Sequence, residues 1–70
     1  MKNKGIEYEV HYYDDKHWFD RITGTEKTEA AAIKRIWSLI SEHNVFDAWF
    51  VAKDGKRVSV STVSGKVHRE

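Results

Sequence analysis

The chain has 70 residues and a formal net charge of +1, and it contains no cysteine and no proline. A chain of this length forms one domain at most and buries only about 60% of its unfolded surface. The absence of cysteine excludes disulfides and thiolate metal sites, and no apolar run approaches the ~18 residues of a membrane-spanning helix. We expect a single small cytoplasmic domain over residues 1–70, ordered from about residue 5 to residue 64, with frayed ends at 1–4 and 65–70.

The first part of the chain predicts a hairpin. Residues 6–13 alternate mainly apolar and polar side chains, which is the period of a half-buried strand. Asp14-Asp15-Lys16 follows, and Asp favours turns because its carboxylate binds nearby backbone amides. We interpret residues 17–22 as the returning strand, which Thr23-Gly24-Thr25 then interrupts.

Only one helix is predicted, over roughly residues 26–43. Thr25 or Thr28 can cap its first turn, and three consecutive alanines favour its start. Asn44 is a candidate for a left-handed C-cap. Four apolar residues follow the spacing of one helical face, which we expect to be buried against a sheet: Ile33, Ile36, Trp37 and Ile40.

A second hairpin is predicted around Lys53-Asp54-Gly55, because Asp-Gly supplies the positive φ of a tight turn. The length of the loop decides which side chains face the helix. With a two-residue turn, Trp49 and Val51 lie on the helix side. The outward side chains are then Phe46, Phe50, Arg57, Ser59 and Ser61. With a three-residue loop and a glycine bulge, the core instead receives Phe46, Ala48, Phe50, Val58 and Val60.

The second alternative leaves Trp49, Val51 and Arg57 on the outward face. The sequence leaves both registers open, and in both a large ring shares the open face with Arg57. The first hairpin adds Tyr13 or Phe19, together with Arg21, to that side.

The order of elements is ββαββ, which predicts an α+β fold. We expect two layers, in which one amphipathic helix packs on a four-stranded, mostly antiparallel sheet. The helical crossover would make the second and third strands parallel unless another strand lies between them, and the sequence leaves this order open. The outline is similar to that of several small bacterial and phage families of unknown function, a likeness of topology with no shared motif.

The sequence offers little for catalysis or metal binding. His11 and His17 flank the aspartate turn, but no histidine spacing typical of a metal site occurs. Ser59 and Ser61 alternate along a strand, which indicates a polar sheet face rather than a nucleophile with its base. No phosphate-binding loop is present. We therefore expect no catalytic residue, no metal and no cofactor.

The aromatic content is the one feature that indicates a function, since nine of the 70 residues are Trp, Tyr or Phe. A single helix covers one sheet face, so rings remain on the other, and an exposed apolar patch marks contact with another molecule. We expect a non-catalytic protein that binds a second copy of itself or a larger protein partner. The residues expected at this contact are Phe19, Arg21, Trp49, Phe50 and Arg57.

The alternative is a sheet-based nucleic-acid binder, in which rings stack on single-stranded bases. Its basic residues would be Lys53, Lys56, Arg57 and Lys66. Charge weighs against it: residues 5–50 carry five basic and nine acidic side chains, whereas residues 53–70 carry five basic and two acidic ones. This asymmetry suits contact between halves or subunits. No membrane or small-molecule partner is expected.

Overall fold

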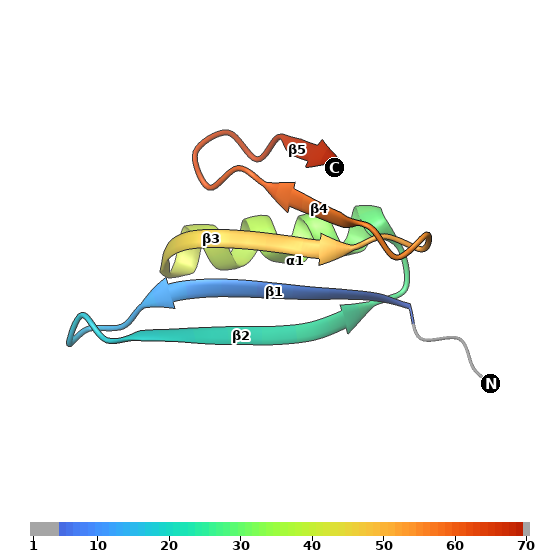
Figure 1. Ribbon diagram of the computed structural model, residues 1–70. Helices are drawn as coiled ribbons and strands as arrows, with labels where there is room; N and C mark the ends of the chain where they lie inside the picture. Colours follow the sequence, from blue (N-terminus) through green and yellow to red (C-terminus); the bar gives the residue numbers. More distant parts are fainter. Residues whose placement is uncertain (1–4, 70) are drawn as a thin grey trace.

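The computed structural model describes residues 5–69 as a sheet with one helix on it (Figure 1). The elements are β1 (Ile6–Tyr13), β2 (Phe19–Glu26), α1 (Glu29–Glu42), β3 (Asn44–Val51), β4 (Arg57–Val60) and β5 (Val67–Arg69). The sheet has the order β2-β1-β3-β4-β5, and every neighbouring pair is antiparallel. The predicted α+β class is therefore confirmed, but the sheet has five strands rather than four.

The strand order explains how the sheet stays antiparallel. β1 lies between β2 and β3, so the crossover through α1 joins two strands that are not neighbours (Figure 1). α1 packs mainly on β3 and β1 and less on β2. The opposite face of the sheet carries no other element within residues 5–69, and we call it the open face.

The fifth strand corrects the expectation that residues 65–70 fray. Val67 pairs with Val60, and Arg69 pairs with Val58. Arg69 Nη2 also donates to Glu29 Oε1 at 2.7 Å, a hydrogen bond that joins β5 to the first turn of α1 and raises the pKa of Arg69. The expected fraying at residues 1–4 and 70 falls outside the described residues.

Both hairpins turn through three-residue loops of the same geometry. In the first, the Asp14 amide donates to the Trp18 carbonyl at 2.8 Å and the His17 amide to the Asp14 carbonyl at 3.0 Å. In the second, Ala52 donates to Lys56 and Gly55 to Ala52, each at 2.9 Å. The second loop is thus the three-residue alternative. The first loop comprises residues 15–17 rather than 14–16, since Asp14 is already paired.

This register decides the core. Buried side chains of the sheet are Ile6, Tyr8, Val10, Ala48, Phe50, Val58 and Val60, and Ala52 directly after β3 is also buried. On α1 the buried residues are Ala32, Ile36 and Leu39, with Ile33 and Ile40 packed beside them. Trp37 was expected in the core, but it is 42% exposed. Its ring lies at the margin of α1, close to Gly65 of the β4–β5 loop.

The helix is shorter than predicted at both ends. It begins at Glu29 because Thr28 is the N-cap, whose Oγ1 accepts from the Ala31 amide at 3.1 Å. Thr23-Gly24-Thr25 does not interrupt β2, which continues to Glu26. At the other end, His43 is the C-cap in extended conformation, and Asn44 already begins β3. The predicted left-handed cap at Asn44 is therefore wrong.

Candidate protein-binding face

Four rings form a contiguous group on the open face, which we call the aromatic cluster: His11, Tyr13, Phe46 and Trp49. The ring centroids of Tyr13 and Phe46 lie 4.6 Å apart, and those of His11 and Trp49 lie 4.9 Å apart in a T-shaped arrangement. His11 also approaches Phe46 at 6.0 Å. The rings come from the adjacent strands β1 and β3, so the ladder between these strands holds them in place.

A β-bulge places Phe46 in this cluster. The β1–β3 register shifts between His11 and Tyr12, so that His11 lies opposite Asp47 and Tyr12 opposite Val45. Phe46 is the extra residue, and it is 44% exposed. The prediction that the three-residue loop buries Phe46 is therefore wrong, because the bulge reverses the alternation upstream of Asp47. Val45 packs against the core instead.

A cation–π contact extends the aromatic cluster toward β4. The guanidinium carbon of Arg57 lies 4.5 Å from the centroid of the Trp49 ring. Arg57 is opposite Val51 in the β3–β4 ladder, and Val51 is two residues from Trp49 on the same face of β3. Such contacts favour a fixed position of the guanidinium above the ring. Val51 is itself 36% exposed, so this end of the open face is also partly apolar.

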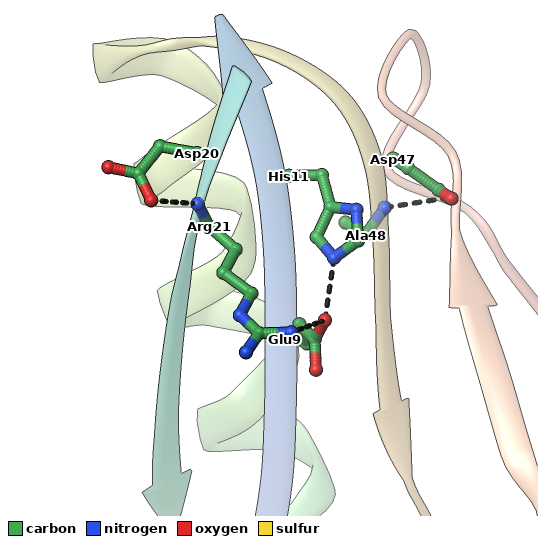
Figure 2. A network of polar contacts seen from close by, with 6 residues as sticks. All are labelled: Glu9, His11, Asp20, Arg21, Asp47 and Ala48. Carbon is green, nitrogen blue, oxygen red and sulfur yellow. Dashed lines mark hydrogen bonds and ion pairs between the residues drawn. The ribbon is translucent and has the colours of Figure 1, made fainter. Parts of the chain in front are cut away.

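Three polar side chains of the open face, Glu9, His11 and Arg21, contact one another (Figure 2). His11 Nε2 and Glu9 Oε2 are 2.6 Å apart, and Arg21 Nη1 lies 3.8 Å from the same carboxylate oxygen. The three residues come from adjacent positions of β1 and β2, where His11 lies directly opposite Arg21. Arg21 therefore supplies a counter-charge to Glu9 within the open face itself.

A shallow depression lies beside the aromatic cluster, toward β2. It is lined by His11, Phe19, Asp20, Arg21 and Phe46. Phe19 is 70% exposed, so an apolar ring stands at its border beside the guanidinium of Arg21. A hollow with apolar walls and a few polar groups suits the insertion of a partner's side chain.

The structure brings together most of the residues expected at the contact. Phe19 and Arg21 line the depression, and Trp49 and Arg57 form the cation–π pair. Phe50 does not belong to the open face, because its side chain is fully buried under α1. The contact residues predicted from the sequence did not include His11 or Phe46, although the two-residue alternative had placed Phe46 outward. Alternation along β1 would have placed His11, whereas no sequence signal indicated the bulge that exposes Phe46.

The basic residues of the nucleic-acid alternative do not gather in one place. Lys53 and Lys56 lie in the β3–β4 turn, whereas Lys66 lies in the loop at the other end of β4 (Figure 1). Arg57 stands over Trp49. Glu7 borders a second depression near Trp49, so its carboxylate makes that part of the open face acidic.

Within residues 5–69, no three His, Asp or Glu side chains gather as a metal site would require. The same part of the chain has no helix with the length and apolar character needed to cross a membrane. No protein-family model, no curated protein and no solved structure matches this chain.

Proposed function

We propose that this chain is a non-catalytic binding protein whose open face contacts another protein, either a larger partner or a second copy. The observation that carries the proposal is the aromatic cluster with Arg57 over Trp49. Aromatic side chains and arginine are the residues enriched at the centres of protein interfaces. The rings already contact one another, so little side-chain freedom is lost on binding.

The polar side chains beside the aromatic cluster are compatible with a contact that is mainly apolar at its centre. Glu9 is shared between His11 and Arg21, so a partner covering these groups would meet charges that already have counter-charges. His11 is held between Glu9 and the Trp49 ring, which supports a structural role rather than proton transfer. We propose the cytoplasm as its setting, since a chain without cysteine needs no oxidising compartment.

Affinity capture from the native host, followed by calorimetry with the purified captured protein, tests this proposal. The double variant Phe46→Ser/Trp49→Ser removes the centre of the aromatic cluster, and we expect it to weaken binding at least about tenfold. Trp18→Ser is the matched control, because Trp18 is 72% exposed but lies in the first hairpin outside the aromatic cluster. Equal loss in both variants, or none in either, would contradict the proposal.

If the partner is a second copy of the chain, self-association takes the place of binding to a captured protein. Self-association through the open face would be lost in the same double variant and kept in Trp18→Ser. Sedimentation equilibrium over a hundredfold range of concentration, about 1 to 100 μM, measures this directly. Thermal melts of all variants establish that each one remains folded.

A further inference from the structure

β2 is the outermost strand of the sheet and has eight residues. One side pairs with β1 along its whole length, and no other element within residues 5–69 pairs with its second side (Figure 1). An uncovered edge of this kind presents unpaired backbone donors and acceptors to another chain. At the opposite end of the sheet the outermost strand, β5, has only three residues.

The turn shows which backbone groups of β2 point outward. The Asp14 amide donates to the Trp18 carbonyl, so this pair is a hydrogen-bonded one. Antiparallel pairs alternate, so the residues of β2 that bind β1 are Asp20, Ile22, Gly24 and Glu26. The amides and carbonyls that point to the free edge are those of Phe19, Arg21, Thr23 and Thr25.

The edge lacks several of the features that block strand pairing. β2 contains no proline and no lysine, and its register with β1 has no bulge. One edge donor is already bound, since the Arg21 amide donates to Asp20 Oδ1 at 2.8 Å (Figure 2). This bond is exposed. The amide can therefore exchange the carboxylate for a carbonyl of a second strand.

We propose that two copies of this chain pair antiparallel through β2, about a two-fold axis at Ile22. Phe19 then lies opposite Thr25, and Arg21 opposite Thr23, of the second copy. Opposite residues of an antiparallel pair lie on the same sheet face, so the open faces of both copies adjoin and both helices lie on the other side. This inference does not rest on the proposed function, because it uses the edge of the sheet rather than the aromatic cluster.

Charge selects this register over its two neighbours. A two-fold axis at Arg21 would set two arginines directly opposite one another, and an axis at Thr23 would set Asp20 opposite Glu26 twice. Like charges directly opposite are destabilising. The axis at Ile22 avoids both, and it joins the free groups of both strands in about eight hydrogen bonds. Asp20 then lies opposite Gly24, and two Ile22 side chains meet on the helix side.

Single cysteines test the register, because the natural chain has none. With the axis at Ile22, the two Ile22 residues form a non-hydrogen-bonded pair with Cα atoms about 4.5 Å apart, which a disulfide can bridge. We expect oxidised Ile22→Cys to form a covalent dimer at least about tenfold faster than Arg21→Cys or Thr23→Cys. Faster crosslinking of either neighbour would overturn this register, as would equal rates in all three.

A proline tests the edge itself. Thr23→Pro removes an amide that points to the free edge, so it leaves the β1–β2 ladder intact. Thr23→Val is the matched control, because it keeps this amide. By sedimentation equilibrium we expect wild type and Thr23→Val to dimerise alike, and Thr23→Pro to dimerise at least about tenfold more weakly.

The double variant Phe46→Ser/Trp49→Ser should dimerise like wild type, which separates this interface from the open face. A monomeric wild type, or a Thr23→Pro dimer as strong as the Thr23→Val dimer, would overturn the proposal. Far-ultraviolet circular dichroism confirms that Thr23→Pro keeps the fold.

Discussion

His17 and Gly55 occupy the same position in two hairpin loops of the same geometry. Each is the third loop residue, and each has a positive φ, 65° for His17 and 86° for Gly55. His17 is the one residue other than glycine with a positive φ in the described part of the chain. A side chain in this conformation costs about 1–2 kcal/mol because Cβ crowds the following carbonyl. The first hairpin therefore retains strain that the second avoids.

His17→Gly should raise the free energy of unfolding by about 1 kcal/mol, measured by urea denaturation. Gly55→Ala is the reciprocal control and should lower it by a similar amount. A Cβ at Gly55 would have no atom within 4 Å, so that effect arises from the backbone alone. A destabilised His17→Gly variant would contradict this account of the loop.

Gly24→Ala should destabilise the protein by about 1–3 kcal/mol. A Cβ at Gly24 would collide with the phenol ring of Tyr8, which lies opposite it and is only 8% exposed. Thr23→Ala, at the neighbouring position opposite Glu9, is the control for a substitution in β2 that does not meet Tyr8. Combining Gly24→Ala with Tyr8→Ala should lower the free energy of unfolding by less than the sum of the two single losses. An additive result would show that the collision is not the cause.

Ile36→Ala should cost about 2–5 kcal/mol, because Ile36 is fully buried. Trp37→Ala should lower the free energy of unfolding by less, about 1–2 kcal/mol. The reason is that the ring is 42% exposed and packs mainly beside Gly65. Thermal unfolding of both variants gives the comparison. A larger loss for Trp37→Ala would mean that α1 presents a different face to the sheet.

Arg57 and Trp49 should be coupled by about 0.5–1 kcal/mol in a double-mutant cycle with Arg57→Gln and Trp49→Leu. The attraction between the guanidinium and the ring is lost in either single variant. Arg35→Gln, an exposed change on the helix, serves as the uncoupled control. A coupling energy near zero would contradict the fixed contact on the open face.

No single- or double-stranded oligonucleotide should bind more tightly than about 10 μM at physiological salt. The basic residues are divided between both ends of β4, and Glu7 would repel phosphates that approach Trp49. Fluorescence anisotropy with a labelled mixed-sequence oligonucleotide measures the affinity. Submicromolar binding that Arg57→Glu abolishes would instead favour a nucleic-acid binder.

Local patterns were sufficient for the two hairpins, the single helix and the α+β class. Asp-Gly at 54–55 predicted the second turn, and alternation along β1 predicted a strand with one buried face. Once the three-residue loop is known, alternation also places Trp49, Val51 and Arg57 outward and Phe50 inward. The choice between the two loops was not accessible, because Asp-Gly occurs in both.

The remaining differences arise from contacts between distant residues. β5 is too short to show a pattern, and it forms because β4 offers an edge and Glu29 binds Arg69. The helix has apolar side chains around more than half its circumference, so periodicity alone could not choose between Trp37 and Leu39. The small side chain of Ala32 lies fully buried, which places Leu39 inward and Trp37 at the margin.

The sequence by itself determined β1 to β4, the single helix, the two antiparallel hairpins and the presence of surplus aromatic side chains. Only the tertiary structure decided that β1 separates β2 from β3, and that a bulge opposite His11 exposes Phe46. Strand order and bulges depend on how strands that are distant in the sequence pack under one helix. The packing energy that decides them does not arise within any local run of residues. The aromatic cluster and the free edge of β2 are both consequences of that packing.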